Sequence, residues 1–129
     1  MKNLLVSLSV IGSLAMATAA LAEGECDKYT TSYDRTYCFA KLFVDSDQEL
    51  NAVYKGLRDT LKGEIRVQLT SAQRDWLKYR DNSCSQGSAI NVDCNYEANR
   101  KRAEFLRDRL RECRVGTCRN DVIIQRNWN

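Results

Sequence analysis

Histidine and proline are both absent from this sequence of 129 residues. The absence of histidine excludes more catalytic mechanisms than the absence of proline does. Without histidine the chain lacks the commonest general base and every Ser-His or Cys-His nucleophile arrangement. Aspartate and glutamate are plentiful, with 17 residues, but no motif singles out a catalytic pair. We therefore expect a protein that is not an enzyme, that uses no cofactor, and that works by binding another macromolecule.

A metal site is also hard to build from this sequence. Its six cysteines include no CxxC pair and have no histidine beside them, so the clustered ligands of a zinc site are missing. An even number of cysteines in a short exported chain is typical of a disulfide framework. We predict three local pairs, each bracketing the end of an element: Cys26 with Cys38, Cys84 with Cys94, and Cys113 with Cys118.

The first 22 residues have the pattern of a secretory signal peptide. An apolar run from Leu4 to Leu14 leads to an A-x-A motif that ends at Ala22, where we predict cleavage. A membrane-spanning anchor is the alternative, but serines and a glycine dilute the run. Because no cysteine follows the motif directly, we expect no lipid anchor either. Residues 23–129 then form one domain in the periplasm or outside the cell.

Helical periodicity predicts an all-α fold for that domain, a small antiparallel bundle of about four helices stapled by disulfides. The first helix is expected over residues 31–44, where one face carries Tyr33, Tyr37, Ala40 and Val44. A second helix is expected to start at Ser46, because Ser46 and Glu49 have the spacing of a capping box. Gly63 can end it in the left-handed conformation.

Two more helices and a tail complete the predicted bundle. A second capping-box pattern, at residues 70–73, predicts a third helix that ends near Cys84. Residues 85–93 are expected to form a loop, and residues 95–114 a fourth helix. The tail carries apolar side chains that would be costly to expose, so we expect it to pack on the bundle, with a short strand as an alternative: Val122, Ile123, Ile124 and Trp128.

Basic residues gather on the last predicted helix although the formal net charge of the chain is only +3. That net charge is too small to indicate a nucleic-acid partner. The structural interpretation is a solvent-exposed face with ion pairs along the helix, such as Glu97 with Lys101 and Asp108 with Arg111. The alternative is a surface that contacts an anionic envelope, built from Arg100, Lys101, Arg102, Arg107, Arg109, Arg111, Arg114 and Arg119.

Three motifs together resemble the family named for the lysozyme inhibitor LprI. They are Asp47-x-x-Leu50-Asn51-x-x-Tyr54, then Ala72-Gln73-Arg74-Asp75-Trp76-Leu77-x-Tyr79-Arg80-Asp81-x-x-Cys84, then Cys94 with Arg102 and Leu106. The resemblance implies an exported helical protein whose partner is a lysozyme-type hydrolase. This chain differs in having Asn99 where the family usually has threonine, and in an additional pair, Cys113 and Cys118.

The motif residues are more simply explained by structure than by contact with a partner. Trp76 and Tyr79 are large side chains on one helical face, so we expect them in the core together with Tyr54. The polar members lie near the predicted helix seams. We expect them to form a satisfied hydrogen-bond network between helices: Asn51, Gln73, Arg80, Asp81 and Arg102.

Contact with a partner is expected at the loop between the predicted cysteine pair, because recognition usually sits on loops held by a rigid scaffold. Gln86, Ser88 and Asn91 can hydrogen-bond into a sugar-binding cleft, and Ile90 can fill an apolar subsite. The neighbouring Lys78 or Arg100 can face the acids of such a cleft. A plain solvated connection is the alternative for each of these residues.

Overall fold

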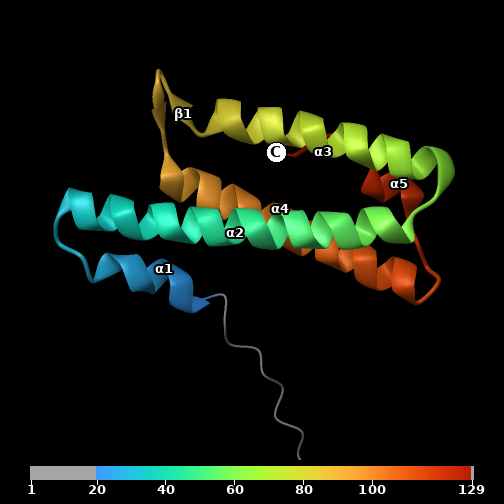
Figure 1. Ribbon diagram of the computed structural model, residues 1–129, viewed down its shortest axis with the longest axis horizontal. Coiled ribbons are helices and arrows are strands. Elements are labelled where there is room, and N and C mark those ends of the chain that lie inside the picture. Colours follow the sequence, from blue (N-terminus) through green and yellow to red (C-terminus); the bar gives the residue numbers. More distant parts are fainter. Residues whose placement is uncertain (1–19, 129) are drawn as a thin grey trace, which may run out of the picture.

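The computed structural model describes residues 20–128 (Figure 1). Helices dominate this part of the chain and confirm the predicted all-α class: α1 (Ala20–Asp27), α2 (Ser32–Thr60), α3 (Gly63–Ser83), β1 (Ser85–Gln86), β2 (Ala89–Ile90), α4 (Val92–Arg114) and α5 (Asn120–Ile123). No helix in this range is long and apolar enough to span a membrane. Most of the predicted signal peptide lies outside the described residues, and its cleavage stays a prediction.

Three long helices make the body of the bundle (Figure 1). α2 and α4 run in the same direction and approach each other closely, whereas α3 runs opposite to both and stands further away. Gly56 permits the close approach, because a Cβ at this position would lie 3.2 Å from Leu110 Cδ2 of α4. The wider space beside α3 is filled by large side chains, and this is where the polar and aromatic motif residues gather.

The predicted break between two helices at Ser46 is wrong, since α2 continues from Ser32 to Thr60. The Ser46 hydroxyl donates to the Phe43 carbonyl of the same helix over 2.8 Å. Glu49 forms an ion pair with Arg107 of α4 instead of reaching back to an N-terminus. The capping-box residues are therefore used in contacts between helices, and burial of Leu50 and Leu57 holds the helix together across the predicted break.

The third helix begins at Gly63, seven residues before the predicted start. The Thr70 hydroxyl donates to the Arg66 carbonyl over 3.0 Å, so Thr70 lies inside the helix and does not cap it. It also accepts a hydrogen bond from the Tyr54 hydroxyl of α2 over 3.2 Å. Gly63 has the expected left-handed conformation, with a φ of +60°, but it does not cap the preceding helix: α2 is capped by Leu61 in an extended conformation, and Gly63 is the first residue of α3.

The face predicted for the first helix does not belong to the core. Tyr33 and Tyr37 are 79% and 62% exposed, and Val44 is also exposed. The reason is that the N-terminal end of α2 extends beyond the end of α3, so α3 does not cover it (Figure 1). Helix α1, which the sequence did not predict, packs against this end of α2.

All three predicted disulfides are confirmed: Cys26–Cys38, Cys84–Cys94 and Cys113–Cys118. The first ties α1 to α2, and the third closes the turn after α4. The tail packs back on the bundle as expected, although it forms the short helix α5 and no strand is assigned to it within the described residues. Ile123 is fully buried, and Ile124 and Trp128 pack against the same core.

Candidate functional site

The segment between Cys84 and Cys94 forms a short β-hairpin. β1 and β2 pair antiparallel, with Ser85 opposite Ile90 and Gln86 opposite Ala89. Gly87 has a φ of +63° and supplies the left-handed residue of the turn. All four strand residues are exposed, and Figure 1 shows the hairpin rising from the end of the bundle where α3 ends and α4 begins. The disulfide joins the two helix ends at its base.

Three of the predicted binding residues, in the hairpin and directly after it, line one groove. Gln86, Ile90 and Asn91 line a groove of about 410 Å³ that also contacts Arg35 and Phe39 of α2. Ile90 is largely exposed. Asn91 has a structural task as well, because its Oδ1 accepts a hydrogen bond from the Cys94 N–H over 3.1 Å and caps α4.

The other predicted binding residues do not line this groove. Ser88 lies at the exposed turn of the hairpin. Lys78 points into solvent from α3, with its Nζ 4.0 Å from Asp75 Oδ1. Arg100 of α4 forms an ion pair with Glu97 over 3.3 Å. The structure therefore does not bring Lys78 or Arg100 to the predicted contact surface, and Arg35 is the cation that lines the groove.

A second group of polar side chains joins the three long helices, and we call it the polar junction: Ser46, Asp47, Arg80, Asp81 and Asn99. Arg80 Nη1 donates to Asn99 Oδ1 over 2.8 Å and to Asp47 Oδ1 over 3.0 Å. Its Nε and Nη2 both donate to Asp81 Oδ1. Asn99 Nδ2 donates to Ser46 Oγ over 3.2 Å. The Arg80 guanidinium is thus hydrogen-bonded from all three of its nitrogens.

The remaining polar motif residues lie outside this junction. Asn51 is exposed, and its Nδ2 is 3.4 Å from Asp47 Oδ2 one turn earlier in the same helix. Gln73 is buried and accepts a hydrogen bond from Arg102 Nε over 3.0 Å. The hydrogen bonds place Arg80, Gln73 and Arg102 between helices, as the structural interpretation of the motif expects. They do not place Asn51 there, and Asp81 bonds to Arg80 of its own helix.

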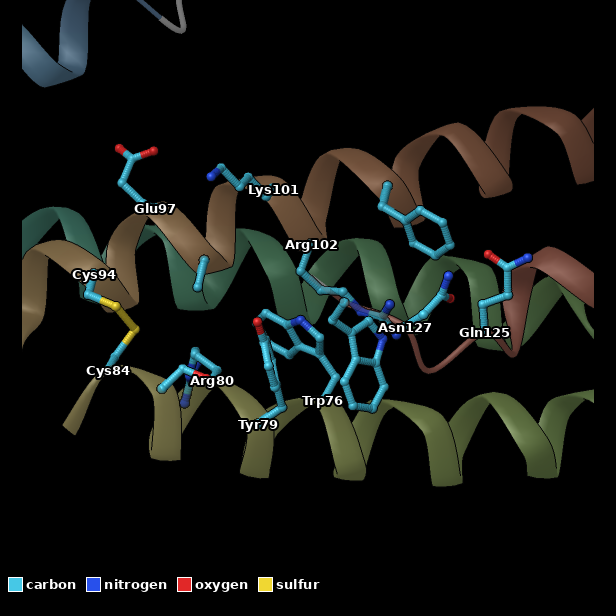
Figure 2. Close-up of a pocket in the computed structure, with 14 residues that line it drawn as sticks. Trp76, Tyr79, Arg80, Cys84, Cys94, Glu97, Lys101, Arg102, Gln125 and Asn127 are labelled. Carbon is cyan, nitrogen blue, oxygen red and sulfur yellow. A yellow bond between two sulfur atoms is a disulfide. The ribbon is translucent and has the colours of Figure 1, made fainter.

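A larger groove of about 430 Å³ lies between α3 and α4, and we call it the aromatic groove. Figure 2 shows Trp76 and Tyr79 rising from α3 toward Arg102 on α4, with Gln125 and Asn127 of the tail beside them. The rings of Tyr79 and Trp128 are 5.5 Å apart at their centres. The sequence analysis missed this groove, because its tail wall comes from a segment whose position follows only from the packed fold. Its lining is Trp76, Tyr79, Arg80, Ser83, Cys84, Cys94, Glu97, Ala98, Lys101, Arg102, Phe105, Gln125, Asn127 and Trp128.

Arg102 is the unusual residue of the aromatic groove. It is only 4% exposed, and its guanidinium carbon lies 5.6 Å from the Trp76 ring centre and 5.2 Å from that of Phe105. Gln73 accepts a hydrogen bond from Arg102 Nε, but Arg102 Nη2 has no hydrogen-bond partner in the part of the chain that the structure describes. Burial lowers the pKa of Arg102 to about 10, because desolvation disfavours the charged form.

Several other arginines of α4, and Arg119 just before α5, are paired with acids. Arg107 pairs with Glu49 and Arg111 with Asp108, as predicted for the latter. Arg109 and Arg119 both pair with Glu112. Glu97 pairs with Arg100 and not with the predicted Lys101. Among residues 20–128 no cluster of histidine, cysteine or acidic side chains could hold a metal ion.

Comparison with known proteins gives one match. The model of the family described as lysozyme inhibitor LprI matches residues 26–106, which span α2, α3, the hairpin and more than half of α4. No curated protein and no solved structure matches the chain. The Cys113–Cys118 disulfide and the tail that covers the aromatic groove follow the matched range. Because the match covers most of the sequence, the chain belongs to the LprI lysozyme inhibitor family.

Proposed function

We propose that this protein inhibits a lysozyme, or a related enzyme that cleaves the cell wall, by binding it outside the cytoplasm. Family membership supports an inhibitor of this kind. The observation that carries the proposal is the hairpin, which is exposed on both strands and fixed at its base by the Cys84–Cys94 disulfide. A short, rigid projection loses little conformational freedom when it binds, which favours tight inhibition.

The hairpin can act by filling the cleft of the enzyme. Lysozyme-type sites work with two carboxyl groups that flank the scissile bond. Ile90 is exposed and apolar, so it suits an apolar subsite, while Gln86 and Ser88 offer hydrogen bonds to groups that normally bind sugar hydroxyls. Arg35 lines the adjacent groove and is half exposed, which gives it access to a partner's acid. Its own contact to Asp27 is long, at 3.4 Å.

Binding of an anionic envelope by the arginine-rich face of α4 is the second candidate function. Ion pairs offset half of the positive charge that this candidate needs, because four acids pair with members of its set of eight basic residues: Glu49, Glu97, Asp108 and Glu112. A diffuse contact of that kind weakens steeply as salt rises from about 50 to 200 mM, whereas a shape-matched contact weakens less. Salt dependence of any complex therefore separates the two candidates.

The test is clearing of cell-wall suspensions by chicken-type, goose-type and invertebrate-type lysozymes with and without the purified protein. We expect at least one class to lose activity as the protein approaches an equal molar amount, with the protein itself chemically unchanged. Absence of inhibition in all three classes, even at a large excess, would overturn the proposal.

A hairpin variant then tests the contact surface. Residues 85–90 are replaced by a Gly/Ser segment of equal length, which keeps the Asn91 cap and both cysteines in place. We expect this variant to fold and to lose inhibition, whereas Lys78→Ala, at an exposed position outside the hairpin, keeps it. Full inhibition by the folded hairpin variant contradicts the hairpin as the contact surface but leaves the inhibitory function standing.

A further inference from the structure

The aromatic groove contains two buried hydrogen-bond donors that have no acceptor among residues 20–128. They are Arg102 Nη2 and Trp128 Nε1, and both residues line this groove. A buried donor without a partner costs about 1–3 kcal/mol, and more when the group is charged. Native proteins leave few such groups unsatisfied. Neither donor therefore has an acceptor from the groove's own lining, and a ligand in the groove can supply one.

The missing acceptor should carry a single negative charge. Within the described residues Arg102 forms no ion pair, and its Nε donates to the neutral amide oxygen of Gln73. Glu97 also lines the groove, but it is paired with Arg100. With a pKa of about 10, Arg102 remains charged at neutral pH. One uncompensated buried cation matches a monoanion, because the desolvation of the pair is then offset by direct attraction.

The rest of the groove fits the body of a small ring. Four aromatic side chains line it, Trp76 and Tyr79 from α3, Phe105 from α4 and Trp128 from the tail. Its volume of about 430 Å³ lies within the range of about 300–1,000 Å³ that is usual for small-molecule sites. Aromatic walls with a few placed polar groups are the usual composition of such sites.

We propose that the aromatic groove binds a small monocarboxylate with a ring, whose carboxylate accepts hydrogen bonds from Arg102 Nη2 and Trp128 Nε1. A carboxylate offers two acceptor oxygens, one for each of the two donors. Both donor atoms are covered in the closed groove. The ligand therefore enters as tail residues 125–128 move aside from α3, to which Arg126 holds them through Asp75 and Ser71.

This site is independent of the proposed lysozyme contact at the hairpin, and either can fail without the other. Two sources share the required chemistry, an aromatic acid and a sugar that carries a carboxylate. Each is represented by an acid and a matched neutral compound. Phenylacetate is compared with 2-phenylacetamide, and N-acetylmuramic acid with N-acetylglucosamine, which lacks the lactyl carboxylate.

Tryptophan fluorescence gives the readout, because the chain has only two tryptophans and both line the groove. Each compound is titrated into the full chain as it exists after export. We expect the acid of at least one pair to change the emission in a saturable way and to bind about tenfold or more tightly than its neutral partner. The pair that responds identifies the source. Equal binding within both pairs, or no binding by either acid, overturns the proposal.

Two variants then assign the charge. Arg102→Met removes the guanidinium but keeps a long side chain, whereas Arg111→Met removes a largely exposed arginine of the same helix that does not line the groove. We expect Arg102→Met to weaken binding of the acid about tenfold or more and Arg111→Met to leave it unchanged. Wild-type affinity in a folded Arg102→Met protein contradicts the proposal. If that variant does not fold, the comparison of acid with neutral compound on the wild-type chain still decides it.

Discussion

Two buried arginines stack on the ring of Trp76, each with its guanidinium carbon 5.6 Å from the ring centre. In the polar junction, Arg80 donates to acceptors from α2, α3 and α4. In the aromatic groove, Arg102 donates to a single neutral amide and leaves Nη2 without a partner. Both residues are buried arginines, but their surroundings differ. Arg80 joins helices through its hydrogen bonds, whereas Arg102 keeps a donor that is available to a ligand.

The difference has an energetic basis. Removing one partner of a buried ionic network is costly because the remaining groups stay buried without compensation. Around Arg80 those groups are Asn99, which is fully buried, and Asp47, which is half-buried. Around Arg102, among the described residues, the group that loses its hydrogen-bond donor is Gln73. Substitutions at the two arginines should therefore have clearly different effects on stability. Removal of the Trp76 ring, which both arginines contact, should lower stability most.

Trp76→Ala should have the largest effect, because it removes the ring on which both arginines stack. Trp76 is buried in the core cluster with Leu69 and Leu106. We expect the free energy of unfolding to fall by about 3–5 kcal/mol, the usual cost of emptying a large aromatic site. Urea denaturation followed by circular dichroism measures it. An unchanged midpoint combined with loss of lysozyme binding would show that Trp76 is a contact residue instead.

Arg80→Met should come next, with a loss of about 3 kcal/mol, since it leaves the buried Asn99 and the half-buried Asp47 without their donor. Arg80→Lys keeps the charge but cannot reproduce three donating nitrogens, so it should fall between the wild type and Arg80→Met. The same denaturation experiment ranks the three proteins. A midpoint for Arg80→Met within error of the wild type contradicts the role that we assign to the polar junction.

Arg102→Met should have the smallest effect, within about 1 kcal/mol of the wild type. Loss of an uncompensated buried charge is favourable, and the unpaired Gln73 oxygen that it leaves is unfavourable by a similar amount. If this variant is as stable as the wild type while Arg80→Met is not, the two arginines have the different roles that we assign to them. A loss as large as that of Arg80→Met would mean that Arg102 is also structural.

Local features of the fold were predictable from the sequence. The three disulfides were predicted correctly because each joins cysteines that are close in the chain and bracket an element end. The positive φ of Gly63 followed from its position after an amphipathic run. The return of the tail to the bundle followed from the cost of exposing its apolar residues, and Ile123 is indeed fully buried.

Features that depend on tertiary partners were not predictable. The capping-box patterns at Ser46 and Thr70 are local, but in the structure their hydroxyls bond to carbonyls one turn earlier in continuous helices. The exposure of Tyr33 depends on where α3 ends. The spacing of residues along α2 gives no information about that position. The aromatic groove needs α3, α4 and the tail together, so no single segment of the sequence could reveal the unpaired Nη2 of Arg102.

The central claim is that the aromatic groove, unlike the polar junction, has donors free for a ligand. Its most direct test is the ¹⁵N–¹H spectrum of the indole groups, which contains one signal from each of the two tryptophans. Substitution of each tryptophan assigns the signals. On addition of whichever acid binds, the Trp128 Nε1–H signal should move downfield, as expected for a donor that gains a charged acceptor, and in Arg102→Met the same shift should need about tenfold or more of the acid. A Trp128 signal that stays in place at saturation, or moves equally with the neutral partner compound, would contradict the account.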